Sequence, residues 1–501
     1  MSRIACLLVP DVPLAAALRA EPELRGRKLA VVAYGQTGSG GQTGSDGQIV
    51  SGRMRGLTPA QARAIDPDLT TRRLSIEGMH SVQEALVDVA LSVTPRVEDT
   101  RPGQVHLDLA GTRALFPSER GLATALETRL AGVGLDDTRI GIGPSATVAE
   151  LAARHCDGGI IVSEGERESF LAPLPLDLLD PPDEIFDRLT RWGLHTLGEL
   201  ANLPQAALGA RLGEEGVRLA RRARGADLQP FRPTPPRLRF EESAETGHPV
   251  DNLEALAFPL RSVSDRLGRR LRVRGLAARE LRLELTLESG RGFARNIGLG
   301  APTTEARVIT SLVRLALEAD APAEPVEALR LIATPGQLET AQLDLFLPPL
   351  PAPAELAITV ARLEALCGTG RVGAPGVEDT HRPDAARLEP FETSRPSESG
   401  PEPEPSVPAP AMALRAFRPA QRVRVRVHDG LPQRVDGLSS AAIQGALVVS
   451  QRAGPWRLFG EWWGERCFAR DYFDVELSDR GVYRMYHNLQ DDSWYVDGIY
   501  D

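Results

Sequence analysis

A stretch rich in proline, glutamate and serine is the feature that most restricts how this 501-residue chain can fold. It is densest over residues 394–410, where few side chains could pack in a core. Such a composition buries too little apolar surface to offset the conformational entropy lost on folding. We therefore expect residues 348–412 to form a tether and linker, disordered from about 369 to 412, with a large part of the chain before it and a small domain after it.

The composition also restricts the class of protein. Hydrophobic residues make up 42% and charged residues 25%, which is typical of a globular protein. Net charge is −10, so any nucleic-acid binding must come from local basic patches. The four cysteines form no CxxC or Cys/His cluster, which argues against a zinc site or a disulfide framework. No run reaches the roughly 18 apolar residues of a membrane helix, so we expect a cytoplasmic protein without a metal or cofactor.

Patterns of apolar residues predict an α+β, multidomain architecture. Residues 1–170 alternate short apolar runs with helical segments, and 171–235 read as helices with a break at Gly193. Residues 236–347 return to strands, with a long helix near 305–319. Residues 413–501 hold four of the five tryptophans and five of the six tyrosines, which predicts a separate, small β-rich domain.

Three segments resemble the Y-family of translesion DNA polymerases in order and spacing. They are residues 22–32, 141–154 and 193–201. The resemblance covers residues 1 to about 350. It implies a polymerase-like palm and fingers over 1–170, a thumb with a helix-hairpin-helix over 171–235 and an α/β little finger over 236–347.

The acids that two-metal phosphoryl transfer requires are absent from the matching positions. The family uses an Asp-x-Asp on the first strand and an Asp-Glu pair ahead of a later strand. The first two positions fall here on Leu8 and Pro10, and the pair falls on Gly103 and Gln104. Asp11 lies one residue late, and on a strand that shift turns a side chain to the other face. The resemblance therefore implies a polymerase scaffold without a catalytic site.

Two other readings stay open. An active lesion-bypass polymerase would need a rearranged metal site made from Asp11, Asp99 and Asp108. The positions that match the family's lysine on the helix after residue 144 carry Ala146 and Glu150, which weighs against this reading. A clamp-tethered reader of DNA structure, without polymerase partners, is the third reading.

Arginine-rich stretches are candidates for sequence-independent contacts with DNA phosphates. Residues 211–239 carry eight arginines against three acids, and 261–295 carry ten against four. In the thumb, Asp180, Pro181 and Pro182 replace a turn that commonly offers free amides to phosphate, so the contribution of the thumb stays open. The residues that we expect to bind primer–template DNA are Arg261, Arg266, Arg269, Arg270, Arg272 and Arg274.

A pentapeptide after the last predicted strand of the little finger resembles the motif with which bacterial proteins bind the sliding clamp. In an extended peptide, Leu345 and Phe346 can enter an apolar pocket while Gln342 hydrogen-bonds at its rim. The alternative is a final core strand, but prolines at 348, 349, 351 and 353 favour an exposed tether. The complete motif is Gln342, Leu343, Asp344, Leu345 and Phe346.

The C-terminal segment resembles the last domain of an inactive branch of the Y-family, which serves a bacterial mutagenesis complex. The similar residues are 454–457, 460–463, 469–473 and 498–501. On a strand, Trp462 and Trp463 would point to opposite faces, one inward and one outward. We expect Trp456, Trp462 and Trp463 to bind partner proteins. The implied partners are DNA, the sliding clamp, ImuA and an error-prone C-family polymerase, acting in damage-induced translesion synthesis.

Overall fold

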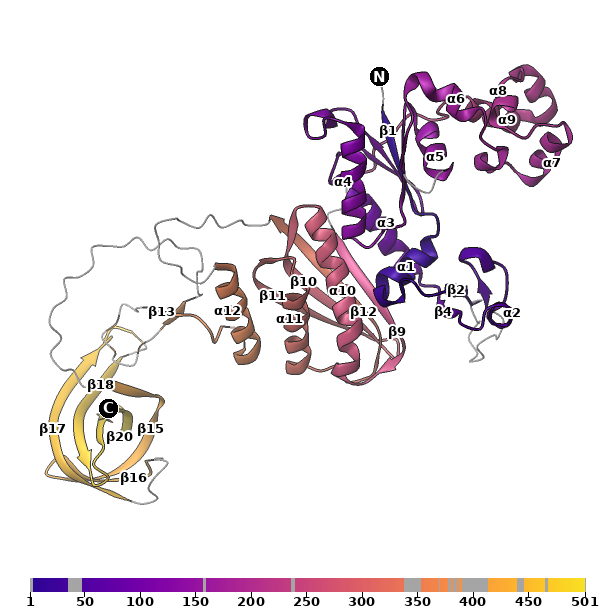
Figure 1. The fold of residues 1–501 in the computed structure, drawn as a ribbon. Coiled ribbons are helices and arrows are strands. Elements are labelled where there is room, and N and C mark those ends of the chain that lie inside the picture. The colour runs from indigo at the N-terminus through magenta and orange to yellow at the C-terminus, as the bar shows by residue number, and fades with distance from the viewer. Residues whose placement is uncertain are drawn as a thin grey trace. The chain divides into compact units, whose positions relative to one another are not determined.

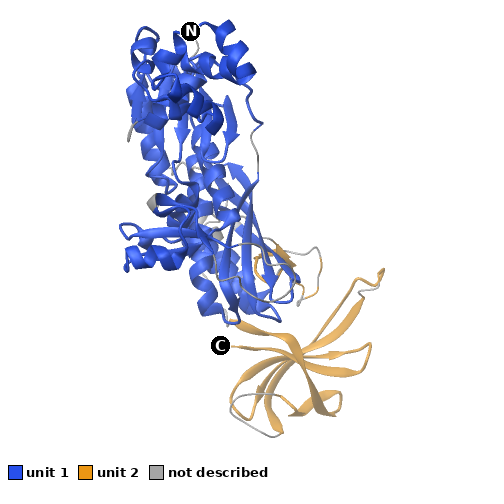
Figure 2. Cartoon of the chain, turned by 90° about the vertical axis from the view of Figure 1, so that its right-hand side faces the viewer, with its two compact units in different colours: residues 1–369 blue, residues 370–501 orange. Residues whose placement is uncertain are grey.

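The chain forms two units, residues 1–369 and 370–501, in the computed structural model (Figure 2). The clamp-like pentapeptide, 342–346, lies outside the residues that the structure describes. Within the described part, no helix has the length and apolar character needed to cross a membrane. The described residues are 3–34, 47–155, 159–235, 239–337, 353–368, 370–376, 380, 382, 385, 387–389, 413–438, 446–464 and 467–500.

We keep the names palm, fingers, thumb and little finger for the segments to which the resemblance assigned them. A sheet with the order β5-β6-β1-β7-β8 forms the centre of the segment named palm. Its middle strand β1 (Ile4–Leu8) is covered on both faces, with α4 and α5 on opposite sides (Figure 1). Leu7 packs in the core with α3 and α4, whereas Cys6 packs against α5. The other elements are α1 (Val12–Ala20), α3 (Ile76–Leu91), β5 (Val97–Arg101), β6 (Gln104–Asp108), α4 (Glu119–Gly132), β7 (Arg139–Gly143), α5 (Ala146–His155) and β8 (Gly159–Ile161).

Close packing of α5 on β7 explains one of the segments that resembles the Y-family. A Cβ atom on Gly141 would lie 2.0 Å from the carbonyl oxygen of Ala149, so only glycine fits at this position. The glycine thus allows the helix to lie directly on the strand.

The fingers and thumb are small and separate in sequence. In the fingers, β2 (Leu29–Ala33) lies between β3 (Gln48–Ile49) and β4 (Thr70–Arg73), beside α2 (Pro59–Ile65). In the thumb, Thr196 and Glu199 form a capping box at the start of the second helix of the expected pair. The thumb helices are α6 (Arg167–Leu171), α7 (Asp183–Arg191), α8 (Leu197–Ala201) and α9 (Gln205–Ala223).

The little finger is a four-stranded antiparallel sheet of order β11-β10-β12-β9. Helices α10 (Leu253–Val273) and α11 (Ala306–Ala319) lie side by side on it (Figure 1). Its strands are β9 (Phe240–Val250), β10 (Leu276–Leu287), β11 (Gly292–Thr303) and β12 (Val326–Gln337).

A further helix, α12 (Pro353–Cys367), lies inside the segment expected to be a linker. Its Ala361 is buried in the core of the little finger. The expectation of a linker throughout 348–412 is therefore wrong for these residues. The prolines at 348, 349, 351 and 353 favoured an exposed tether, but Pro353 is the first residue of α12, and proline is tolerated in the first turn of a helix.

The second unit is a six-stranded β-barrel, in which consecutive strands pair and β20 closes onto β15. A short hairpin, β13 (Ala374–Gly376) with β14 (Arg387–Glu389), precedes it. The β-rich domain expected from the sequence is thus present. The barrel strands are β15 (Leu414–His428), β16 (Leu431–Asp436), β17 (Leu447–Gly460), β18 (Phe468–Leu477), β19 (Val482–Asn488) and β20 (Ser493–Tyr500).

The paired tryptophans do not follow the alternation expected of a strand. Since β17 ends at Gly460, Trp462 and Trp463 lie in the turn that follows it. Both side chains are exposed, 77% and 71%, and their rings meet edge to face with centroids 5.6 Å apart. The expectation that one of them points into the core is therefore wrong.

Candidate functional site

The positions that a polymerase would fill with metal-binding acids lie at one end of β1. Leu8 pairs with Gln104 on β6 and with Arg139 on β7. Pro10 follows the strand, and Gly103 lies in the turn before β6. The structure thus brings the four sequence-predicted positions into one region of the palm.

The backbone at Gly103 excludes a carboxylate in this conformation. Its φ is +80°, and a Cβ atom would lie 2.5 Å from Cγ2 of Val12 and 3.0 Å from the carbonyl oxygen of Val9. The turn is held by two hydrogen bonds, from the Gly103 amide to Oε1 of Gln83 (2.6 Å) and from the Val9 amide to the Gly103 carbonyl (2.8 Å). An aspartate here would require the turn to change shape.

Gln104 is buried and accepts a hydrogen bond from Nε of Arg101 (2.7 Å). The same arginine reaches Glu150 of α5, at 3.2 Å. Two further guanidinium groups surround this carboxylate, those of Arg154 (2.9 Å) and Arg222 (3.4 Å). The acid of this region is therefore neutralised by arginines, which compete with any cation for its oxygens.

The acids of the alternative metal site are engaged elsewhere. Asp11 caps α1 by accepting from the Leu14 amide (3.0 Å), and it also accepts from the Gly52 amide (2.7 Å). Asp108 pairs with Arg96 (2.8 Å) and lies opposite Ile4 in register.

Asp11 and Asp108 are separated by the length of β1, about 13 Å at 3.3 Å per residue. Asp99 of β5 accepts from Nε2 of Gln83 (2.6 Å). Within the described residues, no three His, Cys, Asp or Glu side chains are placed to hold a metal ion together. The rearranged site therefore does not assemble in this conformation.

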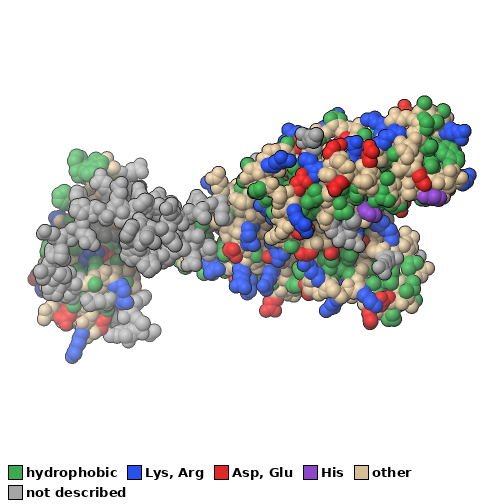
Figure 3. All heavy atoms as spheres, turned by 45° about the horizontal axis from the view of Figure 1, so that its top comes forward, with side chains coloured by type: hydrophobic (Ala, Val, Ile, Leu, Met, Phe, Trp, Pro, Cys, Tyr) green, Lys and Arg blue, Asp and Glu red, His purple; other side chains and the backbone are tan. Residues whose placement is uncertain are grey.

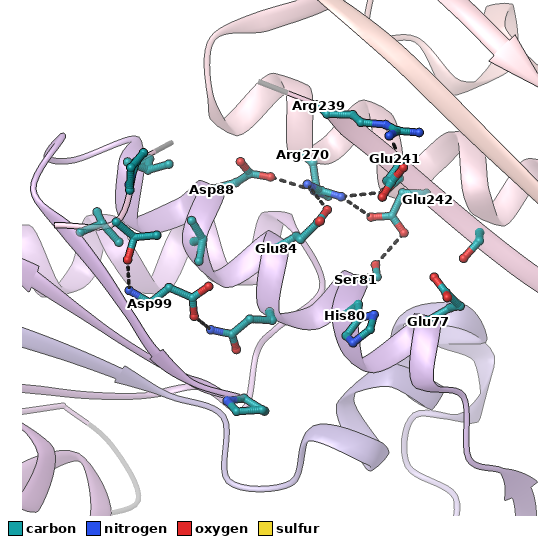
Figure 4. A pocket seen from close by; sticks show the side chains of 18 of the residues that line it. Glu77, His80, Ser81, Glu84, Asp88, Asp99, Arg239, Glu241, Glu242 and Arg270 are labelled. Atoms are coloured by element: carbon teal, nitrogen blue, oxygen red, sulfur yellow. Dashed lines mark hydrogen bonds and ion pairs between the residues drawn. The ribbon is translucent and has the colours of Figure 1, made fainter. Parts of the chain in front are cut away.

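A second polar cluster, which sequence reasoning missed, joins the palm to the little finger beside a cavity of about 500 Å³ (Figure 4). Its centre is Glu242 of β9, which is buried. Glu242 binds Arg266 (2.8 Å) and Arg270 (3.2 Å) of α10, and Ser81 of α3 donates to it (2.6 Å). Arg19 of α1 lies at 3.8 Å. One carboxylate thus links four elements from both domains.

The charges around Glu242 decide its ionisation. Burial alone favours the neutral acid, but Arg266, Arg19 and Arg270 hold the pKa of Glu242 at about 2, below its ordinary value of 4.5. Burial lowers the pKa of Arg19 to about 10, since its cation has lost water. The cluster is therefore a charged interface whose members depend on one another.

Three arginines expected to bind DNA belong to this interface. Arg270 is 2% exposed and also contacts Asp88 (2.8 Å) and Glu84 (2.7 Å) of α3. Arg266 is buried against Glu242, and Arg274 binds Asp88 (3.0 Å). The expectation that Arg266 and Arg270 contact phosphate is wrong for this conformation, because both guanidinium groups are buried in ion pairs. Arg274 is likewise engaged with the palm.

The remaining three expected arginines lie on the solvent side of α10. Arg261, Arg269 and Arg272 line an open hollow of about 950 Å³ together with Arg307 and Arg314 of α11. On the face of the molecule in Figure 3, basic and acidic side chains are interspersed, without one large basic field. The hollow is basic on balance, although Asp265 and Glu305 also line it and pair with Arg269 (2.8 Å) and Arg272 (3.7 Å).

The tryptophans expected to bind partners lie in an exposed apolar region of the barrel. Trp456 on β17 is half exposed, and Phe459 near the end of that strand is 69% exposed. Trp462 and Trp463 continue this surface into the turn. We call these four residues the aromatic arm. Exposed aromatic side chains in a contiguous segment are typical of protein-binding surfaces.

Comparison with models of known protein families gives two matches, both in the part of the chain before residue 350. The model of the impB/mucB/samB family matches residues 12–154, and that of the family's C-terminal domain matches residues 242–337. The first match begins after Pro10, so it leaves out the first two vacated positions.

Two relatives cover different shares of the chain. Protein ImuB of Caulobacter vibrioides is 27% identical over 479 residues, which cover 90% of this chain and all of the relative. DNA polymerase IV 2 of Mesorhizobium japonicum is 30% identical over 344 residues, which cover 66% of this chain and 80% of the relative. Among solved structures, DinB from Sulfolobus solfataricus matches 66% of this chain and 98% of its own, at 14% identity and a TM-score of 0.39. From the family models and the 30% identical relative, the chain belongs to the impB/mucB/samB family.

Proposed function

We propose that the protein is a non-catalytic, polymerase-like scaffold that binds DNA and the sliding clamp. In this role it recruits ImuA and an error-prone C-family polymerase for damage-induced translesion synthesis. The observation that carries the proposal is the state of the vacated centre. Gly103 leaves no room for a side chain, and Glu150, the acid nearby, is held by three arginines.

The similarity to Protein ImuB along 90% of the chain supports this proposal, since it extends into the barrel. The exposed aromatic arm supports a recruiting role, because the free energy falls when a partner covers large apolar side chains that are exposed to water. The hollow with Arg261, Arg269 and Arg272 supports weak, sequence-independent DNA binding. An active polymerase is less well supported, because its candidate acids lie at opposite ends of β1.

Primer extension by the purified full chain tests the proposal. With Mg²⁺ or Mn²⁺ and all four nucleotides, we expect no extended product. The matched controls are the variants Asp11→Ala, Asp99→Ala and Asp108→Ala. If the wild type extends the primer and any one of these substitutions abolishes that extension, the proposal is contradicted. Extension that survives all three would come from a contaminating polymerase and would leave the proposal standing.

A further inference from the structure

The charges of the barrel are divided along its sequence. Residues 413–457, which include β15, β16 and most of β17, carry eight arginines and two aspartates. Residues 458–501, which include β18, β19 and β20, carry four arginines and ten acids. The barrel thus has a basic group of strands and an acidic group, although its net charge is close to zero.

On β15, three arginines lie in a row on the outside of the barrel. Val423 and Val425 contribute to the core, so the alternating Arg422, Arg424 and Arg426 point outward, and all three are exposed. Successive members of the row are about 6.7 Å apart, the length of two strand residues. We call Arg422, Arg424, Arg426 and Arg434 the arginine face.

Two members of the arginine face lie side by side without a compensating acid between them. Arg426 of β15 is directly opposite Arg434 of β16 in register. Like charges directly opposite each other on neighbouring strands are destabilising. Neither residue forms an ion pair with a carboxylate among the described residues, and Asp436 lies opposite Arg424 instead. A bound anion would relieve this repulsion.

Two other arginines of the barrel, one on each group of strands, differ in this respect. Arg484 makes two hydrogen bonds to Asp497, each 3.0 Å, and Arg457 at the arm binds Asp471 at 2.7 and 2.8 Å. The barrel therefore uses these guanidinium groups internally. In the arginine face, by contrast, Arg422 donates to the neutral hydroxyl of Ser493 (2.7 Å), and none of the four guanidinium groups forms an ion pair with a carboxylate of the described residues.

We propose that the arginine face binds the phosphate backbone of single-stranded DNA. An extended strand laid along β15 can present successive phosphates to a straight row of guanidinium groups, whereas the phosphates of a duplex wind away from such a row. Tyr495 of β20 lies opposite Arg422 in register and stacks on Tyr486, with centroids 5.1 Å apart. Its ring offers a place for a base to stack beside the row. This site is separate from the hollow on α10 and from the aromatic arm, so it goes beyond the proposed function.

The test compares full-length variants in their binding to a fluorescent oligo-dT, measured by anisotropy over a range of salt concentrations. The test variant carries Arg422→Thr, Arg424→Thr and Arg426→Thr, because threonine suits a strand. Removing three phosphate contacts should weaken binding about tenfold or more and reduce the salt slope by about 2. The corresponding triple lysine variant keeps the charge and should retain most of the binding. Unchanged melting temperatures would exclude loss of the fold.

A second control separates the barrel from the little finger. The variant with Arg261→Ala, Arg269→Ala and Arg272→Ala should bind duplex primer–template less well and oligo-dT as before. An unchanged salt slope in the threonine variant would overturn the proposal. Equal losses on duplex and single strand would overturn the assignment to single-stranded DNA. If the threonine variant no longer bound a partner protein but bound oligo-dT as the wild type does, the arginine face would serve protein recognition. That result would also overturn the proposal.

Discussion

Glu242 has a structural role that residue type alone does not reveal. Its carboxylate is buried among Arg266, Arg270 and Arg19, and its pKa is held at about 2. An ion pair that has lost its water contributes little net stability, but loss of one partner leaves the others uncompensated. Glu242 therefore matters less as a source of stability than as the counter-ion without which the interface cannot form.

Substitution of Glu242 by glutamine should destabilise the protein by about 3–5 kcal/mol at neutral pH, because buried guanidinium groups then lack their counter-ion. The folded-state pKa lies below the ordinary value of 4.5, so the stabilisation from ionised Glu242 is complete above that pH. It is lost as the pH falls toward 2, and the difference between variant and wild type should shrink over that window. Urea unfolding of both proteins between pH 7 and pH 3 measures this difference.

Glu245→Gln is the matched control, because Glu245 lies on the same strand and is exposed. It should change the free energy of unfolding by less than about 0.5 kcal/mol. If the loss of unfolding free energy caused by Glu242→Gln does not change with pH, the assigned ionisation of Glu242 is contradicted.

The residue scale also shows why part of the site could not be predicted. The structure brings the vacated positions together at one end of β1, where Leu8 lies opposite Gln104, because strand order and spacing fix which residues meet at the end of a sheet. The six arginines of 261–274 are alike in sequence, and only the docking of α10 on the palm separates Arg266 and Arg270 from Arg261 and Arg272. Arg266 and Arg270 are four residues apart and lie next to the buried Val263 and Leu267, and this helical spacing was the available signal that both face the palm.

At the scale of elements, local patterns predicted most of the palm, thumb and little finger. Helices and strands there carry clear apolar periodicity, and glycine or capping residues mark several of their ends. The two errors, α12 and the tryptophan turn, arise where local composition disagrees with tertiary packing. Pro353 suggested a tether, and adjacent tryptophans suggested a strand. Neither pattern contains information about the surface against which the segment packs.

The packing of α12 gives a test at this scale. Ala361 is buried against the little finger, so Ala361→Glu should bury an unpaired charge and lower stability by several kcal/mol. Glu364 lies three residues later on the same helix and is exposed, so Glu364→Ala should be nearly neutral. Thermal melting of the two variants measures the contrast. Equal melting temperatures would mean that α12 is part of a tether, as composition suggested.

At the scale of the whole molecule, the proposed binding surfaces are spread over separate parts of one chain. The little finger and the barrel each carry an exposed arginine surface, and the aromatic arm carries the exposed tryptophans. The pentapeptide 342–346 lies between the last strand of the little finger and α12 in sequence. A scaffold gains from this arrangement, since one tethered contact raises the effective concentration of the others.

The pentapeptide provides the prediction that concerns the whole assembly. Leu345 and Phe346 offer about 3–6 kcal/mol of gross apolar burial, at roughly 1.5–3 kcal/mol for each side chain. Ordering the peptide offsets part of this gain, so we expect clamp binding with a Kd in the micromolar range. Replacing both residues by alanine should therefore take clamp binding below detection.

The same double variant, Leu345→Ala with Phe346→Ala, separates clamp binding from a role in the core. If the segment is an exposed tether, the melting temperature should stay close to that of the wild type while clamp capture is lost. If the two residues instead belong to a core strand, each truncation should cost about 2–5 kcal/mol of stability, and the folded fraction should still capture the clamp. Thermal melting and clamp pull-down on one preparation distinguish these results. A large fall in melting temperature with clamp binding retained would show that the pentapeptide is part of the core and does not bind the clamp.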